Sequence, residues 1–168
     1  MKKLFLIRHA KSSHDDLKLK DIDRPLNNRG VTDAAMIAKI ISEKKIKPDL
    51  IFSSPAKRAL ETAKIFSKEL NYSADAILID PVLYSFDSDL ILSFISGIDS
   101  DAVTVFLFSH NPTFYELANH FTQNKIPSMP TCCIVGIDID CNSWSEIEES
   151  GKQLSLYEFP KKNRKGEE

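Results

Sequence analysis

An arginine and a histidine stand together at the point where the first apolar segment of the chain ends. Leu4-Phe5-Leu6-Ile7 has the composition of a buried strand, and Arg8-His9 follows it directly. Arginine presents a rigid fork of donors that suits a phosphate group, and histidine has a ring nitrogen that attacks or carries a proton near neutral pH. Because ligands of open α/β sheets bind at the carboxyl ends of the strands, this pair predicts an anion site there.

Two later apolar segments end in a similar way. Ser53-Ser54-Pro55 ends the second with Arg58 close behind, and Ser109-His110-Asn111-Pro112 ends the third. If these strands are parallel, their ends share one edge of the sheet, and the helices that begin there direct free N–H groups at the same place. We therefore expect Arg8, His9, Arg58 and His110 to converge on one phosphoryl group. Each of them alone is more often a surface or helix-entry residue, but three equivalent junctions argue against coincidence.

The elements that must position these residues alternate between strand and helix. We expect strands over 4–8, 49–53, 76–79, 102–108 (central and buried), 132–139 and 153–159 (at an edge), and helices over 27–45, 54–70, 88–95 and 111–121. Residues 10–27 have the composition of a polar loop. We expect Asn27 and Ser54 to cap the first two helices, whose apolar stripes are Val31, Ala34, Ala35, Ala38 and Ile41, and Ala59, Ala63, Phe66 and Leu70.

This alternation predicts an α/β fold, a three-layer α/β/α sandwich with a largely parallel sheet. An antiparallel α+β fold would need hairpin turns, which are missing before residue 140. We expect a single domain over residues 1–160, followed by a charged, frayed tail over residues 161–168.

Composition limits the classes of protein that the chain can represent. Its 168 residues suffice for one domain with a core, and a net charge of −2 gives no overall field that would attract nucleic acid or a membrane. The four apolar residues before Arg8 are too few for a signal peptide, and no run reaches transmembrane length. Three cysteines, two of them adjacent, indicate a reducing cytoplasm. No residue cluster has the spacing of zinc ligands, so we expect no metal.

At this point four motifs resemble those of a known family. Arg8-His9-Ala10-Lys11-Ser12 resembles the Arg-His-Gly signature of the histidine phosphatase superfamily, which is also called phosphoglycerate-mutase-like. The segment from Ser53 to Ala63 is similar to its second motif, and Ser109-His110-Asn111-Pro112 to its third, Gly-His-Asn-Pro. Asp23-Arg24-Pro25-Leu26-Asn27-Asn28-Arg29-Gly30 resembles the segment that marks the SixA-type phosphohistidine phosphatase branch.

The resemblance implies a phosphatase in which His9 attacks phosphorus and water then hydrolyses the phosphohistidine enzyme. It implies that Arg8 and Arg58 neutralise the phosphoryl oxygens and that His110 completes this cradle as a donor. Ser12 and Arg24 are implied as substrate-binding residues, and no metal or cofactor is needed. The implied partner is a phosphorylated protein, such as a histidine-containing phosphotransfer domain, or a small phosphate ester.

The chain departs from the family pattern at three places. Ala10 and Ser109 replace glycines, and both are small enough to preserve the close backbone approach. Family members that release alcohols well carry a carboxylate shortly after the third strand, whereas the first one here is Asp87. A small-molecule phosphomonoesterase of the same superfamily and a non-catalytic phosphate-binding regulatory module therefore remain as alternatives to a phosphohistidine phosphatase.

Overall fold

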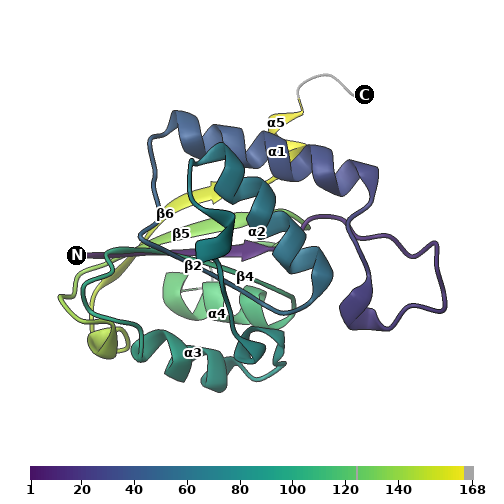
Figure 1. Cartoon of the computed structure of the whole chain (residues 1–168). Helices are drawn as coiled ribbons and strands as arrows, with labels where there is room; N and C mark the ends of the chain where they lie inside the picture. The colour runs from purple at the N-terminus through teal and green to yellow at the C-terminus, as the bar shows by residue number, and fades with distance from the viewer. Residues whose placement is uncertain (124, 165–168) are drawn as a thin grey trace.

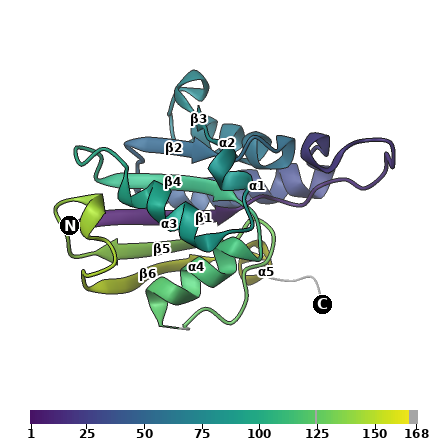
Figure 2. The ribbon, with the colours of Figure 1, turned by 90° about the horizontal axis from the view of Figure 1, so that it is seen from below.

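A six-stranded sheet forms the middle layer of the molecule. The computed structural model describes residues 1–123 and 125–164, and its strands lie in the order β3-β2-β4-β1-β5-β6 (Figure 2). The strands are β1 (Lys2–Arg8), β2 (Leu50–Ser53), β3 (Leu78–Ile79), β4 (Thr104–Ser109), β5 (Ile134–Ile139) and β6 (Lys152–Glu158). The neighbouring strands from β3 to β1 are parallel, whereas β5 is antiparallel to β1 and β6 is antiparallel to β5.

Helices cover both faces of this sheet (Figure 1). On one face lie α1 (Asn28–Glu43) and α2 (Lys57–Glu69), and on the other lie α3 (Ser88–Ser96) and α4 (Thr113–Thr122). Short 3₁₀ turns are η1 (Asp21–Asp23), η2 (Ala74–Ala76), η3 (Pro81–Tyr84) and η4 (Trp144–Glu146), and α5 (Pro160–Asn163) is a single turn. The predicted α/β fold with three layers and a largely parallel sheet is confirmed. None of the described helices is long and apolar enough to cross a membrane.

The apolar residues of β1 serve two cores because successive side chains of a strand point to opposite faces. Phe5 and Ile7 pack with the α1 and α2 side, whereas Leu4 and Leu6 pack with the α3 and α4 side. The neighbouring strand β4 is buried at all six positions, which confirms its predicted central place. The strands β1 and β4, which carry Arg8 and Ser109 at their ends, are therefore both packed in the core.

The first helix begins as predicted, and three residues of its predicted buried stripe, Ala34, Ala38 and Ile41, are buried. The Asn27 side chain caps α1 by accepting from the Gly30 N–H at 2.8 Å. Val31 and Ala35 are exposed, so their assignment to the buried stripe was wrong; Gly30 and Asp33 are buried there instead. The helix approaches the Lys11 backbone closely at Gly30, where a Cβ would lie 2.1 Å from the Lys11 carbonyl oxygen.

The second helix begins later than predicted. α2 starts at Lys57, and its N-cap residue, Ala56, provides no side-chain hydrogen bond, so the prediction of Ser54 as the cap was wrong. Ser54 Oγ instead accepts from the Ala56 N–H at 3.2 Å within the turn before the helix. The predicted apolar stripe of this helix, Ala59, Ala63, Phe66 and Leu70, is buried.

The end of the chain differs in part from the expected frayed tail. Pro160–Asn163 form α5, and Arg164 pairs with the buried Asp33 of α1, so the prediction was wrong for residues 161–164. The burial of Asp33 next to this arginine explains why the segment is held against α1. Residues 165–168 of the predicted tail lie outside the described residues.

Candidate active site

The parallel register brings the three predicted junctions together. Arg8 at the end of β1 pairs with Ser109 at the end of β4, and Ser53 of β2 pairs with Phe108 of β4. The next residues are therefore neighbours: the ring centroids of His9 and His110 lie 5.2 Å apart. Arg58, in the first turn of α2, places its Nε 3.3 Å from His9 Nε2. Burial accompanies this convergence, since His9, His110 and Arg58 are 8%, 7% and 6% exposed.

The surroundings of His9 fix which ring nitrogen carries the proton and which holds the lone pair. Its Nδ1 lies 2.7 Å from the Ala10 carbonyl oxygen, which only accepts, so Nδ1 carries the proton and Nε2 holds the lone pair. Burial, together with the nearby charges of Arg58, Arg8 and Arg24, lowers the pKa of His9 to about 4, although the bond to Ala10 acts in the other direction. The ring is therefore neutral at pH 7 and offers Nε2 as a nucleophile.

His110 is arranged to donate a hydrogen bond into the same space. Ser54 Oγ accepts from the Ala56 N–H and lies 2.7 Å from His110 Nε2, and we assign the Ser54 hydroxyl as the donor to Nε2. This assignment places the ring proton on Nδ1, a buried atom without a partner among the described residues. Burial and the nearby His9 and Arg58 lower the pKa of His110 to about 3. A neutral ring with one unmatched N–H is suited to an oxyanion.

Arg8 carries a second unmatched donor. Its Nη1 donates to the Met129 carbonyl at 2.9 Å, whereas its Nε is buried without a partner in the part of the chain that is described. Burial lowers the pKa of Arg8, and the nearby Arg58 acts in the same direction. Unpaired buried donors are costly and rare in proteins. Arg8 and His110 together therefore fit a site built for an anion.

The two predicted substrate-binding residues lie next to each other at the margin of this site. Arg24 donates to Ser12 Oγ, and its Nε donates to the Ser13 carbonyl at 3.2 Å. The structure gives neither residue a direct hydrogen bond to His9, but Arg24 is close enough that its charge contributes to the lowered pKa of His9. His14 is exposed, and its Nε2 lies 3.0 Å from Arg24 Nη2.

Two polar residues of the site are missing from the sequence prediction. Asp21, in the loop before α1, accepts from Arg58 Nη2 at 2.9 Å and from the Tyr84 hydroxyl at 2.6 Å. These two donors lower the pKa of Asp21 to about 2, Tyr84 having the larger effect, so the carboxylate is ionised. The only signal in the sequence is the spacing of Asp21 and Arg24, which form an ion pair at 2.8 Å.

Asp87, the first carboxylate after the third strand, serves a different purpose. It is the N-cap of α3, and its Oδ1 accepts from the N–H groups of Asp89 and Leu90 at 2.9 and 3.3 Å. An N-cap carboxylate is stabilised by these bonds and by the helix dipole. The structure therefore assigns Asp87 to the start of α3.

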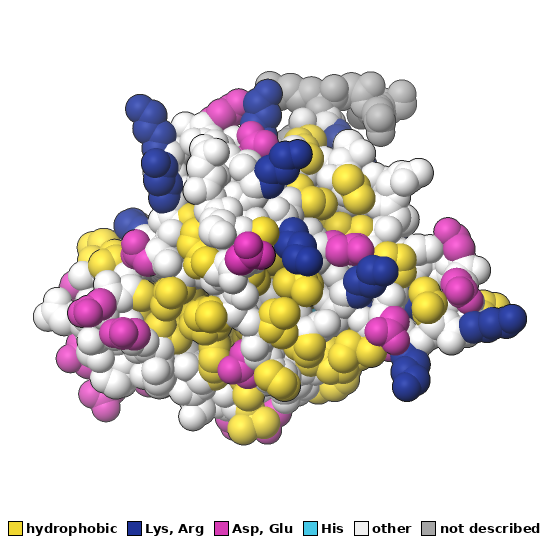
Figure 3. All heavy atoms as spheres, in the orientation of Figure 1, with side chains coloured by type: hydrophobic (Ala, Val, Ile, Leu, Met, Phe, Trp, Pro, Cys, Tyr) yellow, Lys and Arg dark blue, Asp and Glu magenta, His cyan; other side chains and the backbone are white. Residues whose placement is uncertain are grey.

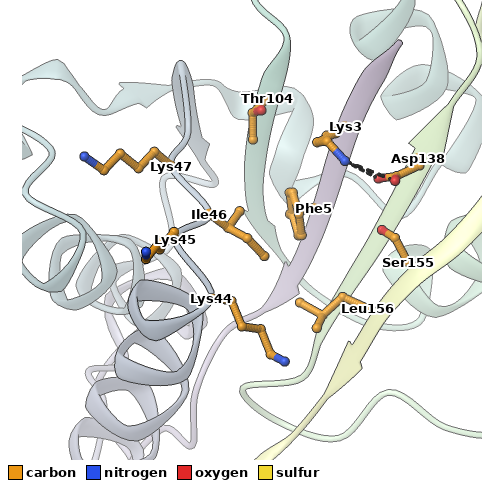
Figure 4. Close-up of a pocket in the computed structure, with 10 residues that line it drawn as sticks. All are labelled: Lys3, Phe5, Lys44, Lys45, Ile46, Lys47, Thr104, Asp138, Ser155 and Leu156. Carbon is orange, nitrogen blue, oxygen red and sulfur yellow. Dashed lines mark hydrogen bonds and ion pairs between the residues drawn. The ribbon is translucent and has the colours of Figure 1, made fainter.

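A separate cavity of about 490 Å³ lies at the opposite end of the strands (Figure 4). Its floor includes Phe5 and Leu156, and Lys44 and Lys45 stand on its rim at the end of α1. Lysines at a helix C-terminus complement the helix dipole, which accounts for their place. None of the predicted site residues lines this cavity.

No group of three or more metal-ligating side chains is found within residues 1–123 and 125–164. On the face of the molecule in Figure 3, basic and acidic side chains are interspersed with hydrophobic ones. The charge at the site comes from arginine. The geometry of the site matches that of a pocket that binds a phosphoryl group next to a histidine nitrogen.

Comparison with known families agrees with this geometry. The histidine phosphatase superfamily (branch 1) matches residues 4–83, a range that contains Arg8, His9, Arg58 and Asp21. The part of the chain that carries these four residues is therefore similar to the histidine phosphatase superfamily.

Individual proteins of similar sequence or structure were also found. A chloroplastic protein of Arabidopsis thaliana, described as uncharacterized, is 34% identical over 153 residues, which are 86% of this chain and 70% of that protein. The crystal structure of a candidate phosphohistidine phosphatase SixA from Agrobacterium tumefaciens has a TM-score of 0.80 and 25% identity, over 95% of this chain and 98% of the other. The protein histidine phosphatase SixA complexed with tungstate has a TM-score of 0.80 and 21% identity, over 95% and 98% of the two chains. The resemblance to SixA-type phosphatases and the phosphoglycerate-mutase-like fold are thereby confirmed.

Proposed function

We propose that this protein is a metal-independent phosphatase that uses His9 as its nucleophile and acts on phosphohistidine in a protein. The observation that carries the proposal is the state of His9: its Nδ1 proton is held by the Ala10 carbonyl, and its Nε2 lone pair faces the site beside Arg58. Nucleophilic histidines of this kind split a difficult transfer into two easier steps.

The first step transfers the phosphoryl group to the enzyme. His9 Nε2 attacks phosphorus in line, the P–N bond forms, and the bond to the leaving group breaks with its electron pair going to that group. Arg8, Arg58 and the Nδ1–H of His110 bind the phosphoryl oxygens, whose charge must be stabilised in the transition state. In the second step, water attacks phosphorus, the P–N bond breaks toward His9, and the water proton passes to solvent.

Ser12 and Arg24 extend this cradle toward the substrate. Arg24 already has its guanidinium at the margin of the site, where Ser12, Ser13 and Asp21 hold it. We assign both residues to substrate binding. Because the arginines supply the positive charge, activity should survive EDTA and need no added cation; loss of activity on chelation that one divalent metal restores would contradict this part of the proposal.

The choice of substrate follows from the leaving group. An alkoxide needs a proton as its bond breaks, which is the task of a general acid. Asp87 caps α3, and the low pKa of Asp21, about 2, leaves that residue without a proton to give. Phosphohistidine protonated on its second nitrogen leaves instead as neutral imidazole, a far weaker base with a conjugate-acid pKa of about 6.5. The likeness to SixA, known in complex with tungstate, supports the same class of substrate.

A substrate comparison tests this proposal. We expect kcat/KM to be highest for a phosphohistidine protein such as a histidine-containing phosphotransfer domain, lower for an aryl phosphate and lowest for an alkyl phosphate. The Asp87→Asn variant should keep this order, because its amide still caps a helix. Fastest turnover of alkyl phosphates, abolished in Asp87→Asn, would instead identify a small-molecule phosphomonoesterase with Asp87 as its acid. Oxyanion binding without turnover of any substrate would indicate a regulatory module.

A further inference from the structure

Asp21 connects three segments of the chain at the candidate active site. Its Oδ2 accepts from Tyr84 of η3 at 2.6 Å and from Arg58 Nη2 of α2 at 2.9 Å. Its Oδ1 accepts from Arg24 Nη1 at 2.8 Å, and its backbone carbonyl accepts from Arg58 Nη1 at 2.6 Å. One exposed residue of the loop before α1 therefore holds donors from two other elements.

The contacts with Asp21 fix the orientation of the Arg58 guanidinium. Nη1 and Nη2 of Arg58 are both bonded to Asp21, so the plane of the guanidinium cannot turn freely. In this orientation the third nitrogen, Nε, faces His9 Nε2 at 3.3 Å. The Arg58 side chain is 8% exposed and that of Asp21 is 53% exposed, so Asp21 holds the arginine from the solvent side.

Asp21 also acts on His110 through the ring of Tyr84. The Tyr84 and His110 rings meet edge to face, with centroids 5.3 Å apart and an interplanar angle of 75°. Ser54 holds His110 through its Nε2 at 2.7 Å. A tyrosine whose hydroxyl is tied to Asp21 therefore provides a fixed wall for the histidine that presents its Nδ1 to the oxyanion.

We propose that Asp21 is a positioning residue for phosphoryl transfer, which holds Arg58 directly and His110 through the Tyr84 ring. This inference rests on the proposed function of the site. A carboxylate at this place could have an opposite role, that of an internal anion which the phosphoryl group must displace from Arg58. Removal of its charge separates the two roles, because a positioning residue assists transfer whereas a competing anion hinders oxyanion binding.

The experiment compares Asp21→Asn with Asp23→Asn. Asp23 lies on the same turn η1 and is exposed, and within the described residues its carboxylate has no ion-pair or hydrogen-bond partner, so it is a matched control. We expect Asp21→Asn to lower kcat for an aryl phosphate about 10- to 100-fold, the scale of a misplaced reacting group. We expect the Kd for inorganic phosphate to stay the same or weaken, and Asp23→Asn to match the wild type. Tighter phosphate binding with undiminished kcat, or no difference from Asp23→Asn, would overturn the proposal.

A second measurement does not depend on turnover. The pKa of His9, followed by NMR of the histidine rings, reports whether Arg58 still faces it, because the Arg58 charge is one cause of its low value of about 4. If Asp21→Asn lets Arg58 turn away, the pKa of His9 rises toward 6.5. If Arg58 stays in place, the loss of a nearby negative charge leaves the pKa unchanged or lowers it, which contradicts positioning.

These two measurements also separate this inference from the proposed function. A wild-type protein without phosphatase activity would refute the proposed function, whereas the NMR titration would still test whether Asp21 holds Arg58. If Asp21→Asn does not fold, Tyr84→Phe takes its place, since it keeps the ring against His110 and removes only the bond to Asp21. We expect Tyr84→Phe to lower kcat by a smaller factor than Asp21→Asn, and an unchanged kcat would refute the path through Tyr84.

Discussion

The ionisation of His9 gives a prediction that follows directly from its surroundings. A histidine with an ordinary pKa of about 6.5 is about three-quarters neutral at pH 7 and only about 3% neutral at pH 5. It would therefore lose its nucleophilic form about 25-fold over this interval. With its pKa lowered to about 4, His9 remains about 90% neutral at pH 5, because burial and the charges of Arg58 and Arg8 disfavour the protonated ring. The sign is clear: acid removes the nucleophile only below about pH 4.

Two assays measure this ionisation. NMR titration of the ring resonances, with His9→Ala to assign the signal, should show His9 titrating near 4. The rate of phosphoenzyme formation under kcat/KM conditions reports the free enzyme. Corrected for the second ionisation of the substrate, it should fall by no more than about 10% between pH 7 and 5. An apparent pKa near 6.5 in both assays would show that burial does not lower the pKa of His9, and it would refute the assigned environment of this residue.

Three further predictions concern the same edge of the sheet. Arg58→Ala should lower kcat by about 10²–10³, or about 2.7–4 kcal/mol, the cost of removing one oxyanion donor; steady-state kinetics beside an unchanged circular dichroism spectrum would check it, and a loss below threefold would contradict the role. The pKa of His110 is lowered to about 3 in the folded protein, so the unfolded state binds more protons than the folded state between about pH 6.5 and about pH 3. The free energy of unfolding should therefore fall as the pH is lowered through this window. Urea titrations should show a flatter dependence for His110→Asn, with exposed His120→Asn as the control, and equal slopes would refute the assignment. Gly30→Ala should destabilise the protein by about 1–3 kcal/mol, because its Cβ would lie 2.1 Å from the Lys11 carbonyl oxygen; a melting temperature equal to the wild type would show that this approach is relaxed.

The convergence of His9, Arg58 and His110 could be predicted because it depends on topology alone. Parallel strands place their carboxyl ends at one edge, and the order of apolar segments along the chain determines which residues follow those ends. The pairing of Arg8 with Ser109 and of Ser53 with Phe108 then brings the three junctions together. No side-chain detail was needed for this part of the site.

The contact of Asp21 with Arg58 could not be predicted in the same way, because the folding of the loop determines which of its aspartates reaches the site. Asp15, Asp16, Asp21 and Asp23 occur in one polar segment, and composition does not distinguish them. In the folded loop, which contains the bridge between Ser12 and Leu26 and the turn η1, Asp21 is the one that contacts Arg58. On α1, Ala34, Ala38 and Ile41 of the predicted stripe are buried, whereas Val31 is exposed and the glycine before it is buried against the Lys11 backbone, a contact that hydrophobic periodicity does not reveal.

The most direct test of the proposed function is rapid-quench trapping of the phosphoenzyme. Wild-type protein mixed with an aryl phosphate labelled at phosphorus should yield an acid-labile, base-stable phosphoprotein, with the label on His9 and at a level that rises and decays with turnover. His9→Ala should form none and lose turnover by orders of magnitude, while its fold is retained. Turnover by the wild type without label on His9, under conditions that preserve phosphohistidine, would contradict the assignment of His9 as the nucleophile.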